Sequence, residues 1–190
     1  LDILNKDSGW FIINQHHPPT ESTISRFCES IYKRSDHIPL QLIMGKATFY
    51  GRDFSIFPGV FIPRQSSDVI IDTLKKKNFS TILEIGAGSG CLSISLALEI
   101  GGITIDAIDN SDIALKNTQE NIISYNCETH INSYFLDILK SIPKNKYDVI
   151  VSNPPYIPAD DINTLEHSVQ IYDPKNALTD YGDGMTFYKR

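Results

Sequence analysis

The sequence contains few cysteines, and their placement excludes two common uses of this residue. The three cysteines, Cys28, Cys91 and Cys127, lie far apart in 190 residues. An odd number without Cys-x-x-Cys spacing argues against a disulfide framework and a structural zinc site. The histidines have no metal-type spacing either, so we expect no metal. The expected location is a reducing compartment, the cytoplasm.

Long apolar runs and an excess of positive charge are also missing. No run approaches the roughly 18 apolar residues that cross a membrane, and no secretion signal is visible. Lysine and arginine number 17 against 23 acidic residues, for a net charge of -6. Tight nucleic-acid binding normally needs a basic face, which this balance disfavours. We expect no membrane partner and no direct nucleic-acid partner, and we expect a monomer.

The first third of the chain has the pattern of a helix followed by a β-hairpin. Apolar residues at i, i+3, i+4 and i+7, beginning with Ile24, predict a helix over residues 20–35. Thr20 or Ser22 is its expected N-cap. Two short apolar strands joined by a tight turn follow over residues 47–56.

From residue 66 onward, helix and strand patterns alternate. The expected helices cover residues 66–77, 91–100 and 111–125, and the expected strands cover residues 81–85, 103–108, 131–136 and 147–152. Ser66 or Ser67 is the expected N-cap of the first of these helices. Its expected inward residues are Val69, Ile70 and Leu74. Alternation with nearly all-apolar strands predicts an α/β fold with a parallel, doubly wound sheet.

A glycine-rich segment joins the first strand of this sheet to the next helix. Residues 84–90 read Glu-Ile-Gly-Ala-Gly-Ser-Gly, and Asp109 ends the following strand. Glycines there allow a sharp turn and close approach of a ligand, and a carboxylate at Asp109 can accept both hydroxyls of a ribose. The pattern fits a dinucleotide or S-adenosyl-L-methionine. The spacing differs from G-x-G-x-x-G, and Glu84 suits a cationic amino acid better than a pyrophosphate, which favours S-adenosyl-L-methionine.

The segment Asn153-Pro154-Pro155-Tyr156 follows the last predicted strand, so we expect it to face the same crevice as the glycine loop. An amide nitrogen is a weak nucleophile, and a site that alkylates it must hold both N–H groups with acceptors. Asn153 offers a side-chain oxygen and Pro154 a backbone carbonyl, while prolines add no competing donors. Tyr156 can pack its ring on the flat amide. Methyl transfer here would depend mainly on positioning and electrostatics.

On these motifs the chain resembles the HemK-type protein-(glutamine-N5) methyltransferases, which modify the glutamine of the Gly-Gly-Gln motif in class-I peptide chain release factors. The resemblance runs from about Phe27 to Tyr188. It rests on these blocks, in the same order: residues 39–45, 49–51, 61–64 (Phe-Ile-Pro-Arg), 84–90, Asp109, 151–158, 172–178 (Tyr-Asp-Pro-Lys-Asn-Ala-Leu) and 182–184. Asn-Pro-Pro-Tyr alone is shared with adenine-N6 DNA methyltransferases, whereas the blocks at 61–64 and 172–178 are not.

The resemblance implies a Rossmann-like class I S-adenosyl-L-methionine-dependent methyltransferase sheet with a helical domain and a hairpin ahead of it. Residues 1–40 would then be the remainder of an N-terminal helical, substrate-docking domain. Residues 41–62 would be a β-hairpin linker, and residues 63–190 the methyltransferase domain. We expect the start of the helical domain and the C-terminal strands of the family's sheet to be missing from this chain.

The resemblance also implies which residues hold S-adenosyl-L-methionine and, after transfer, S-adenosyl-L-homocysteine. The glycine loop and the carboxylates around it would bind the cofactor: Glu84, Gly86, Ala87, Gly88, Ser89, Gly90 and Asp109. Asp137 and Ile138 would lie near the adenine. Arg64 and Ser67 would lie near the methionine end, with Asn153 beside the cofactor.

The glutamine amide would be held by Asn153, Pro154, Pro155 and Tyr156, with a class-I release factor as the protein partner. The chain departs from the family where Pro-Glu-Thr-Glu usually follows Ile-Pro-Arg, because residues 65–68 are Gln-Ser-Ser-Asp. A large aromatic residue often stands where this chain has isoleucine at position 138, after Asp137.

Three other functions fit the same residues. The chain could methylate another glutamine-bearing protein, such as a ribosomal protein. It could methylate adenine N6 in a nucleic acid, although the acidic balance and the lack of a target-recognition domain speak against this. It could also be a non-catalytic fragment that binds the cofactor.

Overall fold

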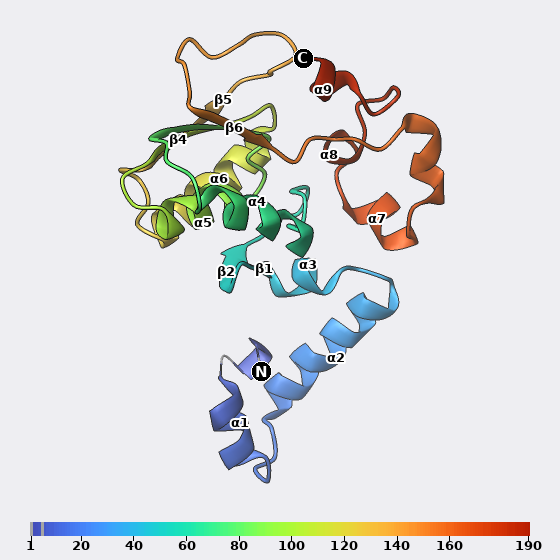
Figure 1. The fold of residues 1–190 in the computed structure, drawn as a ribbon. Coiled ribbons are helices and arrows are strands. Elements are labelled where there is room, and N and C mark those ends of the chain that lie inside the picture. The colour runs from blue at the N-terminus through green and yellow to red at the C-terminus, as the bar shows by residue number, and fades with distance from the viewer. Residues whose placement is uncertain (1, 5) are drawn as a thin grey trace.

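The computed structural model describes residues 2–4 and 6–190, which form an α/β body with a helical arm (Figure 1). The elements of the arm are η1 Asp2–Leu4, α1 Ser8–Asn14, α2 Glu21–Ser35 and α3 Leu40–Met44. Thr20 caps α2 by accepting a hydrogen bond from the Thr23 backbone N–H at 3.2 Å. The helix predicted over residues 20–35 is therefore confirmed, as is one of its two candidate caps.

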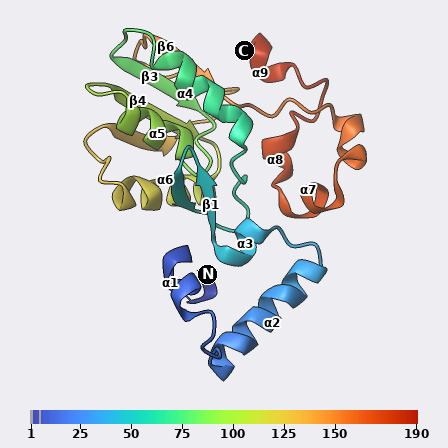
Figure 2. The same cartoon turned by 60° about the horizontal axis from the view of Figure 1, so that its bottom comes forward.

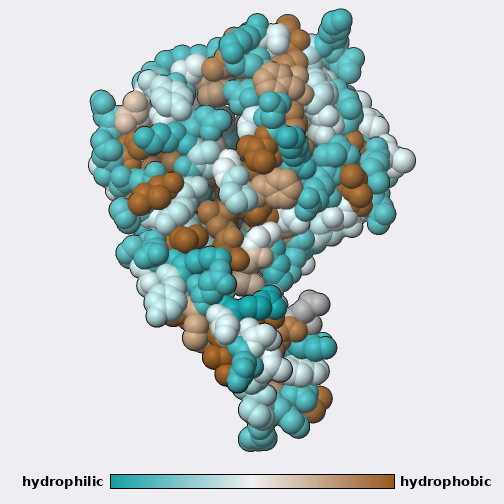
Figure 3. Space-filling model, turned by 180° about the vertical axis from the view of Figure 1, so that it is seen from behind, coloured by the Kyte–Doolittle hydropathy of each residue, from teal (hydrophilic) through white to brown (hydrophobic). Residues whose placement is uncertain are grey.

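The apolar stripe of α2 lies at the surface of the arm. Ile24, Phe27 and Ile31 are 47%, 55% and 53% exposed, although η1 and α3 both contact this helix. Figure 3 shows apolar side chains on the narrow arm as well as on the body. In the part of the chain that the structure describes, no helix is both long enough and apolar enough to cross a membrane.

The predicted hairpin follows the arm and packs into the body. It consists of β1 Lys46–Phe49 and β2 Arg52–Ser55, paired antiparallel. Tyr50 and Gly51 form its two-residue loop with φ values of 47° and 72°, and two positive values are what a type I′ turn requires. Phe49 and Phe54 are buried, with ring centroids 6.4 Å apart. The inner face of the hairpin therefore belongs to the core of the body.

The body is built on a parallel sheet with the strand order β5-β4-β3-β6. Its strands are β3 Thr81–Ile85, β4 Thr104–Asp109, β5 Ile131–Phe135 and β6 Val149–Ser152. The chain passes from β3 outward to β4 and β5, then returns to the other side of β3 for β6. This change of direction creates a switch point at the carboxyl ends of β3 and β6. The predicted α/β, Rossmann-like fold class is confirmed.

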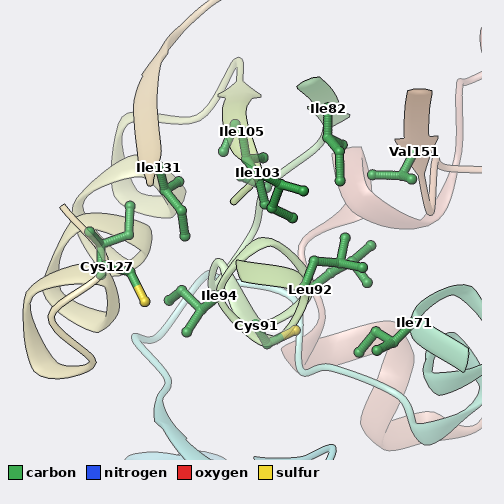
Figure 4. Packing of buried hydrophobic residues seen from close by; sticks show 14 of the residues in the cluster. Ile71, Ile82, Cys91, Leu92, Ile94, Ile103, Ile105, Cys127, Ile131 and Val151 are labelled. Carbon is green, nitrogen blue, oxygen red and sulfur yellow. The ribbon is translucent and has the colours of Figure 1, made fainter. Parts of the chain in front are cut away.

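Helices cover the face of the sheet that is turned toward the hairpin (Figures 1 and 2). They are η2 Gln65–Ser67 with α4 Asp68–Leu74, then α5 Cys91–Glu99 and α6 Asp112–Ser124. Figure 4 shows the aliphatic core, where Ile82, Ile105 and Val151 of the sheet point toward Leu92 and Ile94 of α5. Burying one such side chain stabilises the fold by about 1.5–3 kcal/mol.

The start and the inward face of α4 differ from the prediction. The helix begins with the 3-10 turn Gln65–Ser67, and Ser67 makes no side-chain capping hydrogen bond. Val69 was expected to point inward but is 63% exposed, whereas Ile71 is fully buried. Leu74 is buried as expected. Residues 69–71 are all apolar, so their pattern alone does not select the face that meets the core.

Short helices follow β6 and return toward the arm. They are η3 Ala159–Thr164, α7 His167–Tyr172, α8 Lys175–Leu178 and α9 Thr186–Lys189. The Tyr172 hydroxyl donates a hydrogen bond to the Asp36 backbone carbonyl at 3.0 Å. The rings of His37 and His167 meet edge to face with centroids 5.6 Å apart. This segment therefore connects the end of β6 with the helical arm.

Candidate active site

A cavity lies at the switch point of the sheet, where ligands bind in open α/β folds. It encloses about 1090 Å³ of empty space, part of it open to solvent. The glycine loop and the residues that follow β4 and β6 form its inner wall. The segment between the hairpin and α4 forms one side, and α8 with Phe187 forms the other.

Most of the predicted site residues line this cavity. They are Arg64, Ser67, Glu84, Gly86, Ala87, Gly88, Ser89, Asp109, Asp137, Ile138, Asn153, Pro154 and Pro155. Two predicted residues do not line it. A Cβ on Gly90 would meet Thr118 Cγ2 at 3.0 Å, so this glycine serves the close packing of α5 against α6. The Tyr156 side chain is 56% exposed and lies outside the cavity.

The glycine loop presents open backbone to the cavity. Gly86 and Gly88 have positive φ values of 80° and 59°, and apart from their chain neighbours no described residue has an atom within 4 Å of where their Cβ atoms would be. The backbone N–H groups of Gly86 and Ala87 both donate to the Ile108 carbonyl, at 2.8 and 3.0 Å, which fixes the loop to β4. A ligand can therefore lie directly against a rigid backbone. This cradle fits an extended nucleoside such as S-adenosyl-L-methionine.

Asp109 stands at the end of β4 and supports the glycine loop as well as facing the cavity. Its carboxylate accepts hydrogen bonds from the backbone N–H groups of Gly88 and Ser111, both at 2.9 Å. Burial raises the pKa of this carboxyl, and these backbone donors oppose the rise. Each carboxylate oxygen has lone pairs left for further donors. Asp109 can therefore hold the loop and accept the two hydroxyls of a ribose together.

Glu84 is the most deeply buried acid in the cavity wall. It is 3% exposed and accepts a short hydrogen bond from the Ser93 hydroxyl of α5. Burial raises the pKa of Glu84 to about 8, because the charged form loses its hydration. A cationic ligand in the cavity would favour the ionised form. In that ionised form Glu84 would suit a cationic amino-acid ligand, which stays a prediction from the sequence.

Two buried amides on α6 bind the end of the hairpin, and one of them, Asn121, also binds the glycine loop; neither was predicted from the sequence. Asn121 Nδ2 donates to the Ser55 carbonyl at 2.9 Å and to the Ser89 carbonyl at 2.8 Å. Asn117 Nδ2 also donates to the Ser55 carbonyl, at 2.8 Å, and Asn117 Oδ1 accepts from the Phe57 N–H at 2.9 Å. Both asparagines fall on the inner face of an otherwise apolar helix pattern, and this placement could have identified them from the sequence.

Replacing Asn121 with leucine should destabilise the protein. The change preserves the approximate volume of the side chain but leaves the partly buried Ser55 N–H and the buried Ser89 carbonyl unpaired, at a cost of about 3 kcal/mol. Urea unfolding measures the effect. Gln119→Leu, on the exposed face of the same helix, removes only a surface hydrogen bond from the Ser133 hydroxyl; it is the control and should change stability by less than about 0.5 kcal/mol. Equal stability of the two variants would contradict this account.

The Asn-Pro-Pro-Tyr segment leaves β6 at the rim of the cavity. The Ser152 hydroxyl donates to the Ile85 carbonyl at 2.8 Å and anchors the end of the strand to β3. Asn153 lines the cavity, and its side chain has no hydrogen-bond partner among the described residues. Pro154 and Pro155 line the cavity beside it. The acceptors expected for an amide therefore lie next to the glycine loop.

Arg64 joins two walls of the cavity. Its guanidinium donates to the carboxylate of Asp173 at 2.5 Å and lies 5.1 Å from the centre of the Phe61 ring. Burial raises the pKa of Asp173, and the positive charge of Arg64 opposes the rise. Arg64 lines the cavity as predicted, but its charge is already paired, which the sequence did not indicate.

The wall expected near an adenine contains Asp137 and Ile138. The Asp137 carboxylate accepts from the Leu139 N–H at 3.0 Å and forms an ion pair with Lys140 at 3.0 Å. The pKa of this carboxyl is lowered, chiefly by its hydrogen bond with Lys140. Ile138 presents an aliphatic surface to the cavity. Aromatic lining comes instead from Phe49, Phe61 and Phe187.

Comparison with known proteins gives consistent matches along the chain. The profile of the "Methyltransferase small domain" matches residues 53–186, and that of the "PrmC N-terminal domain" matches residues 1–45. The chain is 33% identical over 193 residues to a "Release factor glutamine methyltransferase" of Clostridium botulinum, covering 98% of this chain and 68% of that protein. It is 40% identical over 156 residues to a protein of the same name in Fusobacterium nucleatum, covering 80% of this chain and 44% of that protein.

Among solved structures, a putative caffeoyl-CoA O-methyltransferase from Staphylococcus aureus matches with a TM-score of 0.42 and 19% identity. The match covers 77% of this chain and 59% of the other. A relative from Bacillus subtilis, also a "Release factor glutamine methyltransferase", is 35% identical over 186 residues. Here the chain spans 63% of the relative's length. The matched proteins are therefore longer than this chain.

Proposed function

Because the chain belongs to the family of release factor glutamine methyltransferases, we propose that it methylates the side-chain amide nitrogen of a glutamine in a protein. We further propose that this glutamine is the one in the Gly-Gly-Gln motif of a class-I peptide chain release factor, in the cytoplasm. One observation carries the proposal. Asn153 and Pro154, the expected acceptors for an amide, line the same cavity as the glycine loop and Asp109.

S-adenosyl-L-methionine, when bound, would supply an activated methyl group on a sulfonium. The chain's own residues would hold it in an extended form along the switch point. Asp109 would accept the ribose hydroxyls, Ile138 would pack on the adenine, and Glu84 would face the amino group. The open backbone at Gly86 and Gly88 leaves room for this approach. S-adenosyl-L-homocysteine would remain in the same cavity after transfer.

The substrate amide would be positioned by acceptors rather than activated by a base. Asn153 Oδ1 and the Pro154 carbonyl would each accept one N–H of the glutamine side chain, which turns the nitrogen toward the methyl group. As the new N–C bond formed, the bond between the methyl group and sulfur would break with its electron pair staying on sulfur, and one amide proton would be released to water. Pro154 and Pro155 carry no N–H, so they offer no donor that competes for the acceptors. Holding the nitrogen in line is the main contribution to the rate.

The proposal is tested with labelled S-adenosyl-L-methionine and a class-I release factor. We expect label on the intact protein and none when the Gly-Gly-Gln glutamine is replaced by alanine, with mass spectrometry locating the methyl group on that side chain. If the cofactor binds but neither protein is labelled, the release-factor proposal is wrong. Ribosomal proteins and adenine-containing DNA assayed in parallel then distinguish another protein substrate, a nucleic-acid substrate and a non-catalytic fragment.

A further inference from the structure

A turn far along the chain lies against the Asn-Pro-Pro-Tyr segment. The Ile157 backbone N–H donates to the Leu178 carbonyl, and the Ala159 N–H donates to the Gly182 carbonyl, both at 3.0 Å. These bonds begin directly after Tyr156, so they fix the downstream end of the segment. Its upstream end is fixed by β6 and the bond from Ser152 to β3. The segment is therefore held at both ends.

Asp180 organises this turn from within. Its Oδ1 accepts from the backbone N–H groups of Gly182 at 2.8 Å and Gly184 at 3.0 Å, and its Oδ2 accepts from the Thr186 N–H at 2.9 Å. Hydrogen bonds from the side chain and backbone of Thr186, followed by those from the two glycines, hold the pKa of Asp180 well below its usual range. One carboxylate thus sets the shape of residues 180–186.

Gly184 makes the closest approach between the turn and the segment. Its φ is +79°, and a Cβ built on it would overlap the Tyr156 carbonyl oxygen and lie 2.9 Å from the carbonyl carbon. Both atoms are backbone, so they cannot move aside without shifting the segment. Gly182 is different, because its φ is not positive and its Cβ would meet the Asp180 carboxylate at 3.6 Å, an ordinary contact.

We propose that the turn at residues 180–186 positions the amide-binding segment, with Asp180 as its positioning residue and Gly184 as the point of contact. By fixing the Tyr156 carbonyl, the turn sets where Asn153 and the Pro154 carbonyl stand relative to the glycine loop. Phe187, which follows the turn directly, lines the cavity, so the same device places part of the cavity wall. The catalytic consequence rests on the proposed glutamine methylation, whereas the contact itself does not.

Gly184→Ala tests the contact, with Gly102→Ala as the matched control. We expect Gly184→Ala to lower kcat for a release factor by about 100-fold, because displacing reacting groups by about 1 Å costs this much. The dissociation constant for S-adenosyl-L-methionine, measured by calorimetry, should stay within about twofold, because most of the cofactor wall lies upstream of the segment. Gly102→Ala adds a Cβ at a similar positive φ of 75°, outside the turn and the cavity, where it meets no atom beyond its chain neighbours within 4 Å, and it should keep kcat within about twofold. A loss of cofactor binding equal to the loss of kcat would overturn the proposal.

Hydrogen exchange provides a readout that does not depend on activity. In Gly184→Ala the amides of Ile157 and Ala159 should exchange faster, while those of Gly86 and Ala87 should keep their wild-type rates. Asp180→Asn, which retains the side-chain shape, should show the same pattern of exchange with a smaller fall in kcat. This second variant allows the test to be made even if Gly184→Ala does not fold. If the amides of Ile157 and Ala159 exchange at wild-type rates in both variants, the turn does not position the segment. If the wild type transfers no methyl group, the proposed function fails while exchange still tests the contact.

Discussion

Replacing Asn153 with alanine is expected to lower kcat for glutamine methylation by at least about 100-fold. The nitrogen of an amide attacks only when its lone pair is turned toward the methyl group, and in the proposed reaction the Asn153 side chain is the acceptor that would fix this orientation. Its side chain makes no hydrogen bond to any other residue that the structure describes, so it is available to the substrate. The adjoining Pro154 carbonyl alone would let the amide rotate.

Single-turnover assays with labelled cofactor and a release factor would measure the effect. Asn163→Ala, which removes an exposed amide on η3, is the control and should keep wild-type rates. Calorimetry on both variants shows whether S-adenosyl-L-methionine still binds. If Asn153→Ala retains activity within about threefold, the side chain does not hold the substrate, and the amide must be oriented by backbone groups alone.

The second large effect concerns the pH dependence of stability and the buried Glu84. Its pKa is raised from 4.5 to about 8, mainly by burial, and the nearby charge of Asp109 adds to the rise. Between these pH values the folded protein keeps a proton that the unfolded chain has lost. The stabilisation is thus complete below pH 4.5 and disappears as the pH rises through 8. Glu84→Gln should remove this dependence, which amounts to about 1.4 kcal/mol per pH unit within the window.

Urea unfolding of the cofactor-free protein at several pH values from 5 to 8 tests this expectation. The stability of the wild type should fall relative to that of Glu84→Gln across this range, with a total difference of at most about 4 kcal/mol. Glu120→Gln, at an exposed position on α6, should follow the wild-type curve. Parallel curves for the wild type and Glu84→Gln would mean that Glu84 is already ionised in the folded protein.

The sequence predicted the sheet and the glycine loop because their patterns are local. Apolar runs such as Thr81–Ile85 end in glycines or acids, and the chemistry of these residues restricts the backbone they can form. The choice of which face of α4 is buried does not depend on local sequence in this way. Val69 and Ile71 are both apolar and adjacent to Ile70, so only the position of the sheet and α5 decides that Ile71 is buried.

The polar contacts of the site depend on segments that are far apart in the chain. Arg64 pairs with Asp173, and Asn121 pairs with Ser55, at separations that no periodic pattern encodes. The resemblance placed Arg64 at the cavity but did not identify its partner. The lining of the cavity by Phe187 likewise follows from how the chain returns after β6.

The bonds from Asn117 and Asn121 to the hairpin limit how the protein can be shortened. A fragment beginning after residue 56 would lose the Ser55 backbone groups that these amides need, and it would remove Phe49 from the cavity wall. Removing only the arm, by cutting between residues 36 and 45, leaves all of these partners in place. The hairpin is thus a fixed outer wall of the body, and the contacts of Asp36 and His37 with α7 hold the adjoining end of the arm as well.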